Sequence, residues 1–342
     1  MKNSRQKIIL GIETSCDETS CAVLGGDELL SNVISSQIEI HRRFGGVVPE
    51  IASRNHLTAI LPVIDEALEK AHITKTDVDA VAVTYGAGLV GALLVGVSAA
   101  KAFAYALGVP LYAVNHIEAH IAANYISTPT LEPPFLAVVA SGGHTGIVRV
   151  DDRNTFTLLG TTVDDAIGEA FDKVARALNL PYPGGPEIDK LAKQGSPCIE
   201  FMSRHNKKSY DLSYSGLKTS VVNYLHTLEQ RGEKPNVPDV CASFQKTAVD
   251  MLVDTATAAV ESTGIKTLCL AGGVAANSYL REKIKAEGDR LGCQTYFPPM
   301  SLCTDNAAMV CARARDMIAA GVAPAKLELN AVSYLKVGEN KS

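Results

Sequence analysis

The order of apolar and polar positions repeats in two distant parts of the chain. In residues 8–24 (IILGIETSCDETSCAVL) an apolar run, a small polar turn and a second apolar run follow one another, and residues 135–150 (FLAVVASGGHTGIVRV) have the same order. A third strand-like run follows each pair, at 28–35 and at 155–162, before helical spacing begins. Such alternation is typical of hairpins. Its repetition predicts a duplicated unit of strands, one in each of two lobes.

A third glycine turn follows the apolar run at 267–270. Its sequence, AGGVAANSYL (271–280), predicts a strand, a Gly-Gly turn and a helix with Asn277 in its first turn. The dinucleotide pattern GxGxxG is absent, but a helix N-terminus with free N–H groups suits a nucleotide or its phosphate. Glycines in the turn at 141–143 likewise let backbone N–H groups approach an anion closely. For that turn alone, a plain hairpin is the alternative.

This layout of strands and turns resembles the actin, sugar kinase and Hsp70 ATPase superfamily. We therefore expect an α/β fold of two lobes, with a duplicated mixed β-sheet flanked by helices. The 342 residues are enough for two cores. We expect residues 1–115 and 301–342 to form the N-terminal lobe and residues 116–300 the C-terminal lobe, with nucleotide and metal in the cleft between them.

The segment 86–109 is almost entirely apolar or small. Such a run is long enough to span a bilayer, but Lys101 lies inside it and a strand-like run precedes it. A helix buried between a sheet and another layer has the same composition, and we expect that arrangement and no membrane contact. The glycines at 86, 88, 91 and 96 would allow close packing on neighbouring backbone.

Two histidines stand four residues apart directly after the strand-like run at 111–114. In NHIEAH (115–120), His116 and His120 would lie one above the other on one face of a helix. Two neutral imidazoles in this arrangement can hold one metal ion, and two ordinary polar residues at a helix start are the alternative. Glu118 falls on the far side of that helix, unlike the general base of zinc peptidases.

Composition narrows the class of protein. A net charge of −5, no tryptophan and only 6% aromatic residues give no sign of a base-stacking platform for nucleic acid, although a local basic face remains compatible with an acidic total. Eight scattered cysteines include no CxxC pair, so neither a zinc knuckle nor a thioredoxin motif is present. Single thiols suit a reducing compartment, and Glu13 interrupts the first apolar run too early for a signal peptide. We expect a cytoplasmic protein.

Ten motifs now point to one family. They are GIETSCDET (11–19), FGGVVPEIASRNH (44–56), NHIEAH (115–120), SGGHT (141–145), DDAIGEAFDKVAR (164–176), YPGGPEID (182–189), SYSGLKT (213–219), SFQ (243–245), AGGVAAN (271–277) and TDNAAM (304–309). In this order, over nearly the whole chain, they resemble the bacterial branch of the tRNA N6-adenosine threonylcarbamoyltransferase family, TsaD, also called Gcp/YgjD or glycoprotease-like.

The resemblance implies a metal site and a nucleotide site. The family's metal ligands fall on His116, His120 and Asp305, and iron is the metal usually assigned, with zinc and magnesium also considered. Archaeal and eukaryotic relatives add a tyrosine where this chain has Val139 or Ala140, so that ligand is missing here. The implied substrate-binding residues are Val139, Ala140, Ser141, Gly142 and Gly143 on the phosphate side, Asp172 at the ribose, and Gly185, Asp189 and Asn277 at the nucleoside.

The resemblance also implies the reaction. The family transfers a threonylcarbamoyl group from threonylcarbamoyl-AMP to N6 of adenosine 37 in tRNAs that read codons beginning with A. This is acyl transfer with AMP as the leaving group, so negative charge develops on the carbamoyl oxygen, where a metal is useful. The general base is unknown. Glu13 and Asp17 are candidates for a base or a supporting role, with ordinary turn polarity as the alternative.

The family works with partner proteins. They are a paralogous TsaB-like subunit, a TsaE-like ATPase subunit and a separate TsaC/Sua-type enzyme that makes the donor. We expect the glycine-rich helix at 86–107 to pair with the paralogue. The basic clusters, Arg42–Arg43 and residues 204–208, are short. Because tRNA binding depends on phosphate neutralisation, we expect partners to supply part of the tRNA surface.

Three other functions stay open at this point. A metal-dependent glycoprotease or peptidase would use the histidine pair, but the glutamate is misplaced for a base. An ATP-dependent small-molecule kinase would fit the superfamily, but Mg²⁺ prefers oxygen ligands over imidazole. A nucleotide-gated scaffold without catalysis would bind nucleotide and transfer nothing.

Overall fold

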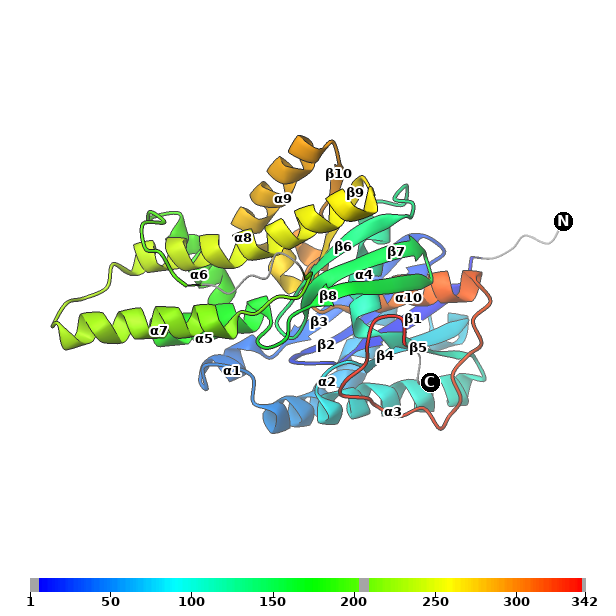
Figure 1. The fold of residues 1–342 in the computed structure, drawn as a ribbon. Coiled ribbons are helices and arrows are strands. Elements are labelled where there is room, and N and C mark those ends of the chain that lie inside the picture. Colours follow the sequence, from blue (N-terminus) through cyan, green and yellow to red (C-terminus); the bar gives the residue numbers. More distant parts are fainter. Residues whose placement is uncertain (1–5, 203–208, 340–342) are drawn as a thin grey trace.

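The computed structural model describes residues 6–202 and 209–339. The basic cluster expected at 204–208 lies outside these residues. The described residues form two sheets with helices around them (Figure 1). The α/β class expected from the sequence is confirmed.

Each sheet contains five strands in the same order. The first has the order β3-β2-β1-β4-β5 and the second β10-β9-β6-β7-β8, and in both a meander of three antiparallel strands continues into parallel strands. The duplicated hairpin unit is therefore confirmed. The strands are β1 Ile8–Glu13, β2 Glu18–Gly25, β3 Glu28–Ser36, β4 Ala80–Gly86, β5 Leu111–Asn115, β6 Phe135–Ala140, β7 Thr145–Asp152, β8 Thr155–Thr161, β9 Thr267–Ala271 and β10 Gln294–Tyr296.

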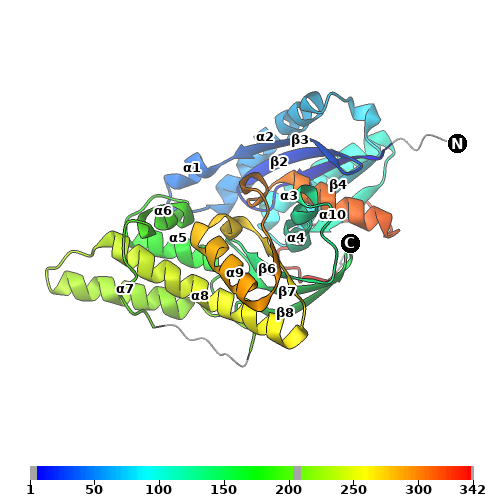
Figure 2. The same cartoon turned by 90° about the horizontal axis from the view of Figure 1, so that it is seen from above.

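The helices form an outer layer on each sheet and a central pair (Figures 1 and 2). Two outer helices, α2 and α3, cover the first sheet, and α8 and α9 lie against the second. The central helices α4 and α10 pack on each other between the sheets. The helices are α1 Ile38–Arg42, α2 Pro49–Lys70, α3 Val90–Leu107, α4 His116–Ser127, α5 Ile167–Ala177, α6 Gly184–Ala192, α7 Ser215–Gln230, α8 Val237–Thr263, α9 Ser278–Leu291 and α10 Ala307–Ala319.

Helix α4 is buried on all sides over its first ten residues. Ile117, Ile121 and Tyr125 pack on the second sheet, whereas the small residues Ala119 and Ala123 face α10 and the first sheet. Its buried histidines and glutamate, His116, Glu118 and His120, all have polar partners, and the alanines allow its neighbour to approach closely. The central pair therefore brings the start of α4 and the start of α10 to the junction of the two sheets.

Helix α3 departs from its expected environment. Leu93, Val97 and Ala104 face the first sheet, but Leu94 and Tyr105 on the outer face are 41% and 75% exposed. Only a third of the helix is buried, so the expectation of a layer on both sides is wrong. Within the described residues it is the one helix long and apolar enough to cross a bilayer.

All four glycines of this segment lie in close contact with neighbouring segments. A Cβ at Gly86 would lie 2.7 Å from Val332 O and one at Gly88 2.6 Å from Ser15 O, so these two meet backbone as expected, whereas the other two meet side chains. A Cβ at Gly96 would lie 2.3 Å from Oγ1 of Thr14, and one at Gly91 would lie 2.5 Å from Oγ of Ser53. The contact at Gly96 joins α3 to the turn of the first hairpin.

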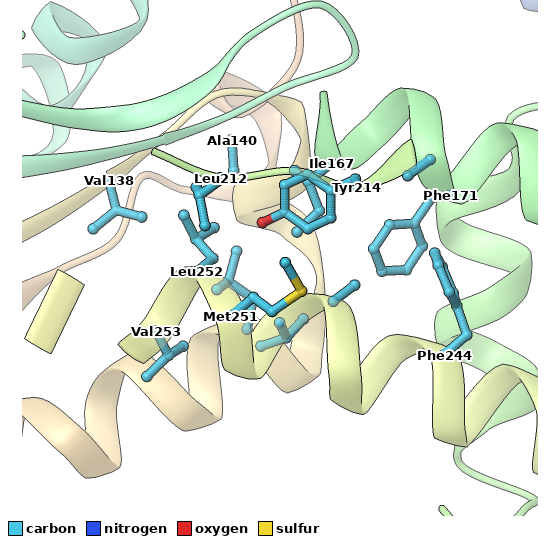
Figure 3. Packing of buried hydrophobic residues seen from close by; sticks show 14 of the residues in the cluster. Val138, Ala140, Ile167, Phe171, Leu212, Tyr214, Phe244, Met251, Leu252 and Val253 are labelled. Atoms are coloured by element: carbon cyan, nitrogen blue, oxygen red, sulfur yellow. The ribbon is translucent and has the colours of Figure 1, made fainter. Parts of the chain in front are cut away.

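The largest core lies between the second sheet and the long helix α8. Figure 3 shows Met251 of α8 pointing toward Tyr214 and Leu252 lying near Leu212, all of them buried. The rings of Phe171 and Phe244 meet edge to face with centroids 5.0 Å apart. This packing fixes α5, whose first turn lies beside the glycine turn at 141–143.

Candidate metal centre and nucleotide cleft

Three side chains from two elements converge at the junction of the sheets. Asn115 ends β5 and caps α4 by accepting a hydrogen bond from Ile117 N at 2.9 Å. The helix therefore starts directly after the strand, and the rings of His116 and His120 meet edge to face, with centroids 4.6 Å apart. Asp305, just before α10, places Oδ1 3.1 Å from Nε2 of His120 and 3.5 Å from Nε2 of His116.

These spacings fit a metal ion. Nitrogen and oxygen ligands bind at about 2.1 Å, so ligand atoms around one ion lie roughly 3–3.5 Å from one another. The two His–Asp distances have this spacing, and candidate ligand atoms of all three residues lie within 4.8 Å of one another. Two imidazoles and one carboxylate leave coordination positions open for substrate oxygen atoms.

Glu13 stands behind His116, at the end of β1. Its Oε2 lies 3.4 Å from Nδ1 of His116, and the hydroxyl of Ser15 lies 3.2 Å from the same nitrogen. Ser15 N donates to Oε1 of Glu13 at 2.5 Å, and the hydroxyl of Thr84 donates to Oε2. A carboxylate on the outer nitrogen of a metal-binding histidine fixes the ring and raises its basicity.

Without a metal ion, the two carboxylates of this group hold a proton on His116, and a bound metal ion would take the place of that proton. Burial disfavours the His116 imidazolium, but Asp305 and Glu13 outweigh burial and raise the pKa of His116 to about 9. Burial likewise disfavours the ionised carboxylates, yet His116 lowers the pKa of Glu13, and His116 together with His120 holds the pKa of Asp305 well below its usual range. Two carboxylates kept ionised in a buried site favour a cation.

A third histidine lies beside this site and was not identified from the sequence. His144, in the turn after β6, has its ring centroid 6.4 Å from that of His116. Burial first, and then the positive charge of His116 and His120, lower its pKa to about 4. His144 stands in the SGGHT motif, so the residue was visible, but its proximity to α4 depends on how β6 and α4 pack.

The turn at 141–143 is closed on one side and open on the other. Ser141 is held within the turn, because its N–H donates to His144 O at 2.8 Å and its hydroxyl accepts from His144 N at 3.0 Å. Gly142 and Gly143 are exposed, with open space where a Cβ would lie. Val139 and Ala140 are buried in β6, so only their backbone atoms border the turn.

Two glycines bring other backbones onto this turn. A Cβ at Gly168, in the first turn of α5, would lie 2.7 Å from Ser141 O, and one at Gly272 would lie 2.5 Å from Ala140 O. Gly272 also has φ +93°, which side-chain-bearing residues rarely adopt. The first turn of α5 and the third glycine turn are thus in contact with the candidate phosphate loop.

The candidate ribose carboxylate lies beside the start of α6. Oδ1 of Asp172 accepts a hydrogen bond from Gly184 N at 2.7 Å. Burial raises the pKa of Asp172 to about 6 against the opposing effect of that hydrogen bond, and Asp17 adds to the rise. Gly185 follows with open space at its Cβ position.

Two other predicted nucleoside contacts make structural bonds. Asp189 accepts from the hydroxyl of Ser278 at 2.9 and 3.0 Å, which joins α6 to α9. Asn277 caps α9 by accepting from Leu280 N at 2.9 Å, and its amide donates to Gln245 at 2.9 Å. Both side chains therefore hold the third glycine turn, and their contact with nucleotide stays a prediction.

Asp17 lies in the turn of the first hairpin and contacts the segment before α6. Its Oδ2 accepts a hydrogen bond from the hydroxyl of Tyr182 at 3.4 Å, and the carbonyl of Tyr182 accepts from Nε of Arg42 at 3.1 Å. The segment before α6 is thus bonded to the first hairpin and to α1.

Comparison with known proteins shows the family of this chain. A family model described as "TsaD: tRNA N6-adenosine threonylcarbamoyltransferase" matches residues 28–312. Proteins of that name from Clostridium perfringens (strain SM101) and Clostridium botulinum (strain 657) are each 53% identical to this chain, over 98% and 97% of it and 99% and 98% of their own lengths. The chain belongs to the tRNA N6-adenosine threonylcarbamoyltransferase family. It is accordingly a transferase.

Solved structures support the fold alone. HypF from T. kodakarensis superposes with a TM-score of 0.65 at 14% identity, covering 93% of this chain and 48% of that protein. The activator of 2-hydroxyisocaproyl-CoA dehydratase from Clostridium difficile, with bound ADPNP, superposes with a TM-score of 0.54 at 13% identity, covering 92% of this chain and 96% of the activator. The two-lobed architecture expected from the glycine turns is thus shared with these proteins.

Proposed function

We propose that this chain transfers the threonylcarbamoyl group of threonylcarbamoyl-AMP to N6 of adenosine 37 in tRNAs that read codons beginning with A. One observation carries the proposal: the His116, His120 and Asp305 group stands beside an open glycine turn, in a chain that matches its family relatives over almost their full length. A new bond forms between N6 and the carbamoyl carbon, the bond from that carbon to AMP breaks, and N6 loses a proton.

The residues of the cleft have separate roles in this proposal. Gly142 and Gly143 present backbone N–H groups to the phosphate, and Asp172 accepts hydrogen bonds from the ribose hydroxyls. His116, His120 and Asp305 hold one divalent metal ion, Fe²⁺ in the first place and Zn²⁺ or Mg²⁺ as alternatives, which supplies Lewis acidity at the carbamoyl oxygen.

The two candidates for the general base are not equally favoured. Glu13 is fully buried and bonded to Ser15, Thr84 and His116, so we assign it to holding the His116 ring rather than to taking a proton from N6. Asp17 is 5% exposed and bonded to Tyr182, and it stays the candidate for that proton.

The lobe limits are also part of the proposal. We keep residues 1–115 with 301–342 as one lobe and 116–300 as the other. Helix α10 packs on the first sheet, which supports the return of the chain at 301, whereas α4 contacts both sheets and follows the boundary at 115.

The outer face of α2 and α3 suits the TsaB-like paralogue. Leu57 and Leu61 of α2 are each 65% exposed, Val90, Leu94 and Tyr105 of α3 are exposed as well, and the two helices pack against each other. Apolar side chains gathered on one face indicate a protein interface. The TsaE-like ATPase, the TsaC/Sua-type donor enzyme and a cytoplasmic location are proposed from the family resemblance. Arg42 and Arg43 are exposed and are candidates for tRNA contact.

The alternatives have less support. A peptidase would need Glu118 as a base, but this carboxylate forms a buried ion pair with Arg313 at 2.9 Å. A kinase is suggested by fold alone, and the imidazole ligands suit Mg²⁺ poorly. A scaffold without catalysis would leave tRNA unmodified.

Mass analysis of tRNA nucleosides tests the proposal. Depletion of the protein should remove threonylcarbamoyladenosine, and the wild-type chain should restore it. A His120→Ala variant should fail to restore it, whereas Arg290→Ala on the exposed side of α9 should succeed. Unchanged threonylcarbamoyladenosine after depletion contradicts the proposed function.

A further inference from the structure

Arg281, in the first turn of α9, joins two segments that carry candidate ligands. Its Nε donates to Ala275 O at 2.5 Å, and its Nη2 donates to Pro298 O at 2.6 Å and to Sγ of Cys303 at 3.2 Å. Ala275 belongs to the third glycine turn, two residues before Asn277. Cys303 is buried and stands two residues before Asp305. One guanidinium therefore connects the nucleotide turn with the metal-ligand loop.

The other side of Asp305 is attached to the first sheet. Asn306 caps α10 by accepting from Met309 N at 3.1 Å, and Ala307 N donates to the hydroxyl of Ser20, in β2, at 2.9 Å. Asp305 is thus fixed between an attachment to the first sheet through Ser20 and an attachment to the second lobe through Arg281. Of these two attachments, only the one through Arg281 also contacts the third glycine turn.

We propose that Arg281 is a positioning residue that couples nucleotide binding at the third glycine turn to metal binding at Asp305. The inference rests on the proposed placement of the nucleotide against that turn. A nucleotide that orders residues 272–277 fixes the position of Ala275 O and therefore of the Arg281 guanidinium. Through its bonds to Pro298 O and Cys303, the guanidinium then fixes the segment 298–303, which leads to Asp305. Such coupling is reciprocal, so metal binding raises nucleotide affinity by the same factor.

The coupling requires the shape of the guanidinium. Its planar fork can donate from two different nitrogens to two carbonyls at once, whereas a lysine ammonium is a single point charge. Arg290 offers a matched control, because it is on the same helix and its Nε bonds Glu287 at 2.6 Å on the exposed surface.

Titration of the full-length chain with Zn²⁺ against a chelator, with and without saturating AMP, tests the coupling. In the wild type, AMP should raise Zn²⁺ affinity at least about fivefold, the low end of typical couplings. Arg281→Ala and Arg281→Lys should each reduce this ratio to about one, and Arg290→Ala should keep it. Circular dichroism and the unfolding temperature monitor folding of each variant.

Two outcomes would overturn the coupling. One is a wild-type Zn²⁺ affinity that does not depend on AMP although AMP binds, a result that needs no variant. The other is a folded Arg281→Lys chain with the full wild-type ratio. Threonylcarbamoyladenosine formation is measured separately. If the wild-type chain forms none while AMP still raises its Zn²⁺ affinity, the proposed function is contradicted and the coupling stands.

Discussion

The turns of the two hairpins have the same place in the same topology but opposite surroundings. In the first hairpin, Glu13 and Thr14 are completely buried, and the hydroxyl of Thr14 donates to Ala92 O of α3 at 2.9 Å. In the second, Gly142 and Gly143 are exposed with nothing near their Cβ positions. In this duplicated scaffold, one turn thus holds the side chain of His116, a candidate metal ligand, and the other leaves its glycines open.

The largest effect should come from the ligand that both lobes position. Asp305→Ala removes one of three metal ligands, so metal affinity and transfer activity should fall together by more than about 100-fold, beyond the range seen when only a ligand's partner is lost. Elemental analysis and a transfer assay measure both. Asp289→Ala, at an exposed ion pair with Lys285, is the control. Full metal occupancy in Asp305→Ala would refute the ligand assignment.

The buried turn of the first hairpin should affect metal binding through Glu13. Glu13→Gln keeps the shape of the side chain but removes the charge that faces Nδ1 of His116. Metal affinity should fall about 10–100-fold, as for other partners of metal-binding histidines, and AMP affinity should change little. Competition with a metal chelator and calorimetry with AMP give the two numbers. Equal losses of both affinities would mean that the two turns do not have separate roles.

A pair of glycine substitutions compares the turns directly. Gly96→Ala places a Cβ 2.3 Å from Oγ1 of Thr14 and should lower the free energy of unfolding by about 1–3 kcal/mol, the usual cost of overpacking. Gly142→Ala has open space and should change it by less than about 0.5 kcal/mol while weakening AMP binding. Urea unfolding and calorimetry measure these effects. A larger loss of stability in Gly142→Ala than in Gly96→Ala would mean that the turn of the second hairpin is the more tightly packed one.

The sequence predicted the duplicated hairpins and the histidine pair for physical reasons that are local. Alternating apolar runs identify strands, and a spacing of four places His116 and His120 on one helix face. Asp305 came from the family resemblance, because 185 residues separate it from His120. Arg281 and His144 act through contacts that only the packed chain creates. For α3, the apolar composition did not reveal that only one face of the helix is buried in the protein.

The smallest effect concerns the ionisation of Asp172 beside the open turn. Its pKa is raised to about 6, and a ribose needs the ionised, accepting form. AMP affinity should therefore fall as pH drops below about 6, by at most about tenfold per pH unit, and calorimetry from pH 5 to 8 measures it. Asp172→Asn should bind AMP more weakly at pH 7 and lose this dependence.

Stability should change in the opposite direction. Because the folded pKa of Asp172 lies above its ordinary value of 3.8, the folded protein binds this proton more tightly than the unfolded chain does. The resulting stabilisation is fully present below about pH 4 and is lost as pH rises through about 6. Replacing Asp172 with Asn should therefore flatten that part of the stability profile. An AMP affinity that stays constant from pH 5 to 8 in the wild type would remove Asp172 from the ribose site, whatever the stability profile shows.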